Sequence, residues 1–305
     1  MKFIKKVPMA ISGLALAIAA LGNLLLPYGE GIRYFCGILS SIVLCFFILK
    51  LIFDTKGVWE DLKNPAIHCV TPTFTMVLMI LCSYVQPYLG NMVVYLWLGA
   101  LFLQVLIILL FIKRHIFDFK LQNVFPGWFV SGVGIVVASV TGPVMGMRAL
   151  GQVIFWIGFS IYFALLPVFI YRMIKIRPLP EPVRPQLAIL IAPMSLCTVG
   201  YFSAFEQNNA LLVFFMQGLL IITYLYVLAN MTSLLRLPFS PAYVAYTFPF
   251  VIGATAFSVF NRFLVNEGYY FFSIVPGITL FLAIIFISYV FVRYTIFLTI
   301  QFKNS

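Results

Sequence analysis

The sequence predicts an all-α integral membrane protein, and three features of its composition predict this class. Of the 305 residues, 63% are hydrophobic and only 9% are charged, and the mean hydropathy is +1.10. Soluble domains carry roughly 25% charged residues, so a soluble fold is excluded. The net charge of +11 would suit a nucleic-acid ligand, but the basic residues lie in short clusters between apolar runs, as in membrane topology. We therefore expect the lipid bilayer as a partner and no nucleic acid.

Ten apolar runs are long enough to cross a bilayer, because a helical span needs roughly 20 apolar residues. The first run follows MKFIKK, as in a signal peptide, but it ends at Leu26-Pro27 without a clean small-residue cleavage site. We expect it to be retained as the first helix. The expected spans are about 7–27, 32–53, 65–86, 91–112, 123–142, 147–174, 185–204, 208–235, 240–264 and 269–299.

Short linkers between consecutive runs predict that neighbouring helices pair as antiparallel hairpins. The sixth, eighth and tenth runs are longer than a bilayer requires, so they can tilt or project past the lipid. A single transmembrane domain over residues 1–305 would then consist of five hairpins, at about 7–53, 65–112, 123–174, 185–235 and 240–299.

Basic residues divide unequally between the two sets of linkers that this alternation creates. Three of them, Arg33, Arg148 and Arg262, lie in one set, and sixteen lie in the other set or near the termini. Cytoplasmic loops carry the excess of Lys and Arg, so both termini should be cytoplasmic in a multi-pass protein of the cell membrane. The sixteen are Lys2, Lys5, Lys6, Lys50, Lys56, Lys63, Lys113, Arg114, Lys120, Arg172, Lys175, Arg177, Arg184, Arg236, Arg293 and Lys303.

Proline and small or hydroxylated residues recur in the odd-numbered runs, whereas the even-numbered runs are bulkier. Each odd run has a proline at or near its inner end, or inside it, which should bend the helix because it removes a backbone hydrogen bond. Small residues let helices pack closely and line a polar path. We expect an inner ring of odd helices around a pore; the alternative is that these residues serve helix packing alone. The prolines are Pro8, Pro72, Pro126, Pro193 and Pro249, and the candidate pore-lining residues are Gly13, Thr73, Ser131, Ser195 and Thr247.

Carboxylates are absent from the interior of every run, and this bears on what could pass. All eight acidic residues lie in linkers or at the ends of runs. Cation pathways commonly use rings of carboxylates, so an anion is the favoured passenger. Coupled carriers usually place an ionisable group within the membrane. The candidate for that role is His68, near the inner end of the third run, which is either a proton relay or a helix-end histidine.

Enzymatic and cofactor chemistry finds no support in the motifs. The chain has no H-E-x-x-H, G-x-S-x-G, phosphate-loop or G-x-G-x-x-G pattern. Its five cysteines show no CxxC spacing, and most lie in apolar runs, as buried small hydrophobic residues do. We expect a protein that is not an enzyme and that has no cofactor and no metal site.

The ninth run carries the most specific local pattern, FSPAYVAYTFPFVIGATA, in which Phe248 directly precedes Pro249. An aromatic ring at a proline bend could close a narrow pore, because an apolar constriction does not replace the hydration of an ion. At these residues the chain resembles the tellurite-resistance/dicarboxylate transporter family. The resemblance extends over nearly the whole chain and rests also on the Pro8-to-Gly13 spacing, NPAIHCVTPTFTMVLM in the third run and RPQLAILIAP in the seventh.

The resemblance implies a quasi-five-fold arrangement of the hairpins, with odd helices inside, and a homotrimer with one pore per subunit. It also implies that Phe248 is the pore gate and that a small inorganic or organic anion is the partner. The leading hypothesis is an anion channel or uniporter. The alternatives are a secondary transporter of C4-dicarboxylates such as malate, an exporter of a toxic oxyanion such as tellurite, and a non-transport membrane scaffold or lipid enzyme. The seventh run departs from the family pattern, because Ala192-Pro193-Met194 lacks a second proline that many relatives carry.

Overall fold

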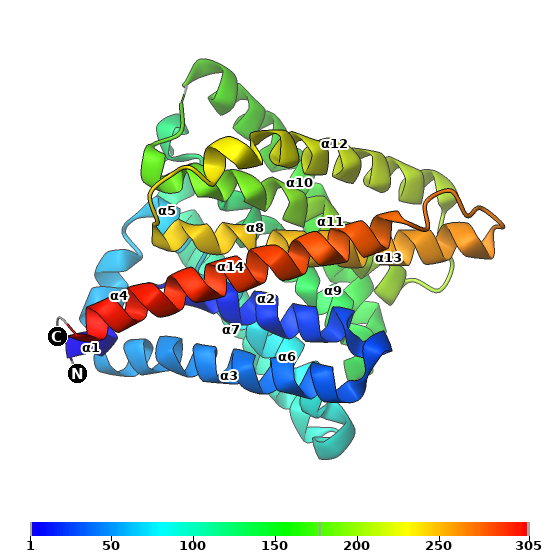
Figure 1. The fold of residues 1–305 in the computed structure, drawn as a ribbon, viewed down its shortest axis with the longest axis horizontal. Helices are drawn as coiled ribbons and strands as arrows, with labels where there is room; N and C mark the ends of the chain where they lie inside the picture. The colour runs from blue at the N-terminus through cyan, green and yellow to red at the C-terminus, as the bar shows by residue number, and fades with distance from the viewer. Residues whose placement is uncertain (1, 177, 304–305) are drawn as a thin grey trace.

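The computed structural model describes residues 2–176 and 178–303, and all regular structure in this range is helical (Figure 1). Arg177, one of the sixteen basic residues, lies outside the described residues. The first hairpin consists of α2 (Ile11–Leu24), η1 (Leu26–Tyr28) and α3 (Glu30–Phe53), preceded by α1 (Lys2–Lys5). The second consists of α5 (Pro65–His68), α6 (Thr73–Leu89) and α7 (Met92–Phe111), which continues as one π-helical turn, η2 (Ile112–Ile116). The connecting segments contain α4 (Thr55–Asp61) and η3 (Leu121–Asn123).

The other three hairpins have inner members that combine α-helix with 3₁₀-helix. The third consists of α8 (Trp128–Val133), η4 (Gly134–Val136), α9 (Val137–Thr141), η5 (Gly142–Met145) and α10 (Arg148–Lys175). The fourth consists of η6 (Glu181–Ile191), α11 (Ala192–Ala204) and α12 (Ala210–Leu234). The fifth consists of η7 (Pro241–Tyr246), α13 (Phe248–Asn266) and α14 (Val275–Lys303).

The predicted number of spans agrees with the structure. Over the described residues, nine helical stretches are long and apolar enough to cross a bilayer, and α2 adds a shorter apolar helix of 14 residues. α2 starts at Ile11 rather than at residue 7, because Pro8 disfavours helix at the residue before it. α14 starts at Val275, later than the predicted 269. The chain turns at Gly268, whose φ of +86° is accessible mainly to glycine, and it turns again over residues 271–274 before the helix begins.

The inner helices form a closed ring, which confirms the predicted arrangement. α2 contacts α6, which contacts α9; α9 contacts α11, α11 contacts α13, and α13 contacts α2 again. The four inner spans of membrane length are 61–78% buried, against 28–39% for the outer helices. The bulky residues of the outer helices therefore face lipid, while the small residues of the inner helices meet neighbours on every side.

Small residues and hydroxyl groups hold the helices close together. A Cβ at Gly158 of α10 would lie 2.2 Å from a methyl carbon of Val136 in η4. The Tyr84 hydroxyl of α6 donates to the carbonyl oxygen of Ala19 in α2 at 2.5 Å, and the Ser40 hydroxyl of α3 donates to that of Ala15 at 2.7 Å. The two hydrogen bonds fix α2 within the ring, since lipid offers no competing hydrogen-bonding groups.

Both termini lie at the same end of the molecule, beside α1, α4 and α5 (Figure 1). The rings of Phe3 and Phe302 are 5.5 Å apart, edge to face. The linkers that join one hairpin to the next also return to this end. Together with the adjoining helix ends and both ends of the chain, they carry most of the basic residues. We call it the terminal end.

Candidate functional site: a vestibule that ends at Phe248

A cavity of about 450 Å³ lies among the inner helices near the terminal end, and we call it the vestibule. All five inner spans contribute to its wall, so it lies at the centre of the ring and not between two helices at its edge. Representative lining residues, one pair from each span in chain order, are Pro8 and Gly13, Ile67 and Thr73, Phe129 and Val130, Ile189 and Leu196, and Val244 and Phe248.

The lining of the vestibule stops at a common depth. The deepest lining residues on α6, α11 and α13 are Met76, Leu196 and Pro249. Just beyond them the inner helices are packed, and Val77 and Val251 are fully buried. Phe248 directly precedes Pro249 and so lies at this depth, where Phe129 of α8 also lines the cavity.

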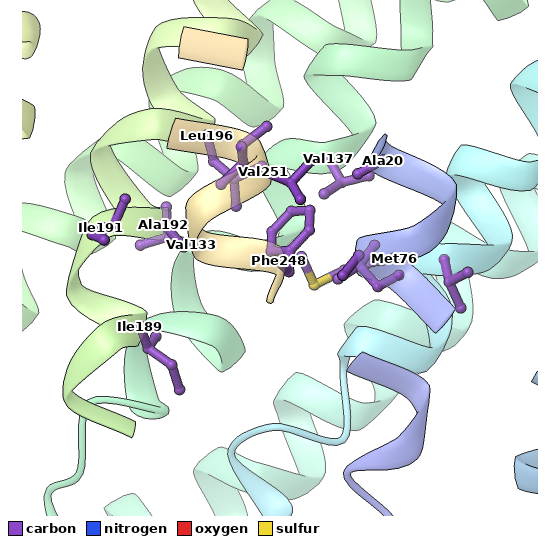
Figure 2. Packing of buried hydrophobic residues seen from close by; sticks show 14 of the residues in the cluster. Ala20, Met76, Val133, Val137, Ile189, Ile191, Ala192, Leu196, Phe248 and Val251 are labelled. Carbon is purple, nitrogen blue, oxygen red and sulfur yellow. The ribbon is translucent and has the colours of Figure 1, made fainter. Parts of the chain in front are cut away.

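Figure 2 shows the Phe248 side chain in the middle of the inner ring. The ring lies between Met76 of α6, Val137 of α9 and Ala20 of α2, with Leu196 of α11 close by. Phe248 is 6% exposed, and its neighbours in this view are also buried. These labelled neighbours of Phe248 therefore come from helices other than its own, and they are apolar.

The backbone before Phe248 is held by tyrosine hydroxyls. Within η7, Tyr246 donates to the carbonyl oxygen of Leu234 at 3.1 Å, and Tyr243 donates to that of Leu237. Tyr294 of α14 donates to the carbonyl oxygen of Pro241, the first residue of η7. These hydrogen bonds connect η7 to the end of α12 and to α14. The segment that directly precedes Phe248 is therefore fixed in position.

The five prolines stand where a helical segment begins. Pro72 is the N-cap of α6, and Pro193 and Pro249 lie in the first turns of α11 and α13, directly after η6 and η7. Pro8 and Pro126 precede α2 and α8. Proline is tolerated in a first turn, where its missing N–H has no intrahelical acceptor. Pro193 and Pro249 therefore mark a change from 3₁₀-helix to α-helix within their spans. Pro8, Pro193 and Pro249 also line the vestibule.

Two of the candidate pore-lining residues, Gly13 and Thr73, lie on the vestibule wall. The Thr73 hydroxyl donates to the carbonyl oxygen of Val70 at 2.8 Å and lies 2.8 Å from the Ser12 hydroxyl. A Cβ at Gly13 would lie 3.2 Å from Val244, so glycine keeps α2 close to η7 there. The structure thus brings these two residues to the site, with the Thr73 hydroxyl already bonded.

The other three candidates face protein and not the cavity. Ser131, Ser195 and Thr247 are almost completely buried and are absent from the described vestibule lining. Ser195 donates to the carbonyl oxygen of Ile191 at 2.7 Å, and Thr247 donates to that of Val244 at 2.7 Å. Ser131 donates to the carbonyl oxygen of Cys69 at 3.0 Å.

The charged and amide side chains of the vestibule lie toward its terminal end, and sequence reasoning missed their role. They are Lys6, Lys50, Asp61, Asn64 and Gln186. Lys50 and Asp61 form an ion pair of 2.9 Å, and the Gln186 amide donates to the carbonyl oxygen of Ala66 at 2.9 Å. The signal available in the sequence was the position of Lys50, inside an apolar run rather than after it.

His68 does not face the vestibule. It is fully buried, and its Nδ1 lies 3.0 Å from Nε2 of His115 in η2. The His68 ring also packs edge-on against Phe111, with centroids 5.3 Å apart. His115, which the sequence did not single out, is thus its partner between the two helices of the second hairpin. Among the described residues, no group of three or more His, Cys, Asp or Glu could hold a metal ion.

Comparisons with known proteins extend these observations. A family model described as voltage-dependent anion channel matches residues 6–295, which include the vestibule and all of the five hairpins except the last turns of α14. The uncharacterized transporter MJ0576 of Methanocaldococcus jannaschii is 27% identical over 247 residues, which cover 72% of this chain and 70% of that protein. A second uncharacterized transporter of the same organism, MJ0762, is 25% identical over 247 residues, covering 71% of this chain and 70% of the relative.

Proposed function

This chain belongs to the voltage-dependent anion channel family, as its resemblance to the tellurite-resistance/dicarboxylate transporters predicted, and from that premise we propose that it conducts small anions passively through the centre of each subunit, with Phe248 as the gate. The family consists of channels and transporters and not of enzymes, and the chain is a multi-pass membrane protein with an anion-transport role. The ion, the gate and the passive mechanism are the proposal.

One observation carries the proposal: a cavity to which all five inner spans contribute has Phe248, a buried phenylalanine, in the wall of its deep end. A passage along the ring axis would have to cross the position of Phe248. The neighbours that Figure 2 labels around that ring are apolar, and an apolar constriction stops an ion because it does not replace the ion's hydration shell.

Charge in the vestibule supports an anion as the passenger. The one carboxylate among the described lining residues is Asp61, and Lys50 neutralises it at 2.9 Å. Lys6 also lines the vestibule, and the terminal end carries most of the basic residues. Long-range attraction by these bases acts over about 8 Å at physiological salt, so it favours entry and not passage through the constriction.

The test is anion flux into proteoliposomes for chloride, nitrate, malate and sulfate, with the native chain beside Phe248→Ala. We expect Phe248→Ala to raise the flux of at least one anion by roughly tenfold or more, because a narrow apolar constriction is removed. The matched control is Phe250→Ala, which removes a buried ring of the same helix that packs against Phe286 at 4.3 Å. Unchanged flux for inserted Phe248→Ala protein would exclude Phe248 as the gate.

The size of the vestibule favours a second candidate, a secondary transporter of organic anions such as C4-dicarboxylates or an exporter of a toxic oxyanion. Liquid water occupies about 30 Å³ per molecule, so about 450 Å³ holds far more than a bare inorganic ion. The same flux experiment separates the two candidates. A carrier saturates with substrate and responds to a proton gradient, whereas passive conduction shows no coupling.

We also propose that both termini are cytoplasmic in the cell membrane and that the protein is a homotrimer. The excess of basic residues at the terminal end supports the orientation, and the family resemblance supports the trimer. The mass of the purified complex in detergent tests the trimer, and a monomeric mass would contradict it. The orientation is tested below, together with the gate.

A further inference from the structure

Lys50 is a buried cation in the wall of the vestibule. It lies in the last turn of α3, and its side chain is 6% exposed. Its ammonium donates to the carbonyl oxygen of Val7 at 2.8 Å and, over a longer distance, to that of Lys5 at 3.5 Å. Burying a charge is costly unless it is paired, and two carbonyl oxygens do not neutralise an ammonium.

The neutralising group is a carboxylate that also lines the vestibule. Asp61, the last residue of α4, places Oδ2 2.9 Å from the Lys50 ammonium, and its side chain is 33% exposed. Both residues line the cavity. The protein's own carboxylate therefore occupies the anion-binding position of Lys50, on the side from which an anion in the vestibule would approach.

The remainder of the vestibule is suited to an apolar group. Between Lys50 and Phe248 the wall includes Val244, Ile189 and Met76 together with other apolar residues. Its volume of about 450 Å³ falls in the range of about 300–1,000 Å³ that small-molecule sites occupy, and such sites are mostly apolar with a few placed polar groups. An inorganic ion gains nothing from apolar walls, whereas an organic anion buries its hydrocarbon part against them.

We propose that the vestibule binds organic carboxylates with a short apolar body, and that the Lys50 ammonium holds the carboxylate after it displaces Asp61. The proposal rests on the proposed function, because it takes the vestibule as the entrance of the anion path, and it names the class of anion that enters. Asp61 then acts as a built-in competitor that keeps Lys50 paired when no anion is bound.

The chain offers a matched control on the same helix. Glu60 precedes Asp61 in α4 and pairs with Lys63 at 2.7 Å, but the side chains of that pair are 59% and 67% exposed and do not line the vestibule. Glu60→Gln removes the same charge as Asp61→Asn from the same segment. An effect that is confined to Asp61→Asn must come from the vestibule and not from the net charge of α4.

The experiment measures binding of benzoate to the full chain in detergent by isothermal titration calorimetry. We expect Asp61→Asn to tighten benzoate binding about fivefold, because a tethered competitor is removed, and Glu60→Gln to leave it unchanged. Lys50→Met should abolish benzoate binding, and Lys50→Arg should retain it. Succinate, which has a second carboxylate in place of an apolar body, should bind more weakly than benzoate.

Unchanged or weaker benzoate binding in Asp61→Asn would overturn the proposal, as would full binding in Lys50→Met. If Lys50→Met does not fold, the comparison of Asp61→Asn with the native chain decides alone. Equal binding of succinate and benzoate would contradict the apolar part of the site. Binding in detergent does not require an open gate, so failure here leaves anion conduction standing, and failure of Phe248→Ala to raise flux leaves this site standing.

Discussion

Buried hydroxyl groups of the inner helices are satisfied within the protein, and this limits what they can offer to a passing anion. Thr73, Ser195 and Thr247 each donate to a backbone carbonyl oxygen of the preceding turn. A hydroxyl has one proton to donate, so these side chains must rotate before they can contact an anion. At the residue scale, we therefore propose Lys50 and Phe248, rather than these hydroxyl groups, as the residues that bind the anion and close the path.

Gln217 of α12 is a buried polar side chain that is not satisfied by hydrogen bonds within the described structure. It is 1% exposed, and neither its amide nitrogen nor its amide oxygen has a hydrogen-bond partner within the described structure. Gln104 of α7 is equally buried, and it is satisfied only in part: its oxygen accepts a hydrogen bond from the Thr75 hydroxyl, while its amide nitrogen has no partner within the described structure. A buried amide that is wholly unsatisfied lowers stability more than one that is satisfied in part.

We predict that Gln217→Leu raises the thermal stability of the protein in detergent, by about 1 kcal/mol, because it removes an unsatisfied polar group. Gln104→Leu should raise stability less, because it removes one unsatisfied atom rather than two, and the Thr75 hydroxyl keeps the carbonyl oxygen of Pro72 as an acceptor at 2.9 Å. Thermal unfolding of the two variants beside the native chain tests this. A loss of stability in Gln217→Leu would show that the Gln217 amide is satisfied in the membrane protein.

Some of these residues could be predicted from the sequence and others could not. Phe248 could be singled out, because it stands beside a proline in a recognisable pattern. Lys50 was missed, because charge counting assigned it to topology although it lies inside an apolar run. Its pairing with Asp61 could not be predicted, because it depends on how α4 folds back. The direction in which a helix side chain points depends on how the helix is rotated about its own axis. Composition does not determine this rotation, so it could not show that Ser131, Ser195 and Thr247 face protein.

At the scale of the element, the inner spans differ from the outer helices in being assembled from several short segments. η6 and η7 precede α11 and α13, and η4 separates α8 from α9. Hydropathy predicted the spans, because their apolar length is read directly from the sequence. It could not predict the 3₁₀ segments, because close contact with neighbouring helices decides where the helix tightens. Val136 of η4 lies in such a contact, against Gly158 of α10 and Gly200 of α11.

We predict that Gly158→Ala lowers the stability of the protein by about 1–3 kcal/mol, because the added methyl group overpacks the contact with η4. The Cβ would lie 2.2 Å from a methyl carbon of Val136, so the two elements must move apart. The matched control is Gly218→Ala in the outer helix α12, where no atom lies within 4 Å of the added Cβ. Thermal unfolding should show a loss for Gly158→Ala alone, and equal losses would contradict the tight packing of α10 on η4.

At the scale of the molecule, the packing of the closed ring determines which face of α13 can line the proposed central passage. Phe250 and Phe257 pack against Tyr224 of α12, with ring centroids 5.6 and 5.1 Å apart. Thr255 lies seven residues after Phe248, nearly two full turns along the helix, and so on the same face. It is partly exposed although it lies in an inner span. Thr255 should therefore face the passage about 10 Å beyond Phe248.

Reactivity of an introduced cysteine at this position measures most directly whether Phe248 blocks an axial passage. Cys45, the exposed native cysteine, is first replaced by Ser, and an impermeant thiol reagent is applied to either side of the membrane. Ala245→Cys, on the vestibule wall, should react from the cytoplasmic side, which also tests the orientation. Ala256→Cys, at a fully buried position, is the unreactive control.

We predict that Thr255→Cys reacts from the extracellular side with the native Phe248 present, and from the cytoplasmic side only when Phe248→Ala is added. Reaction from the cytoplasmic side past the native phenylalanine would contradict the gate. Failure to react from that side after Phe248→Ala would contradict the passage itself.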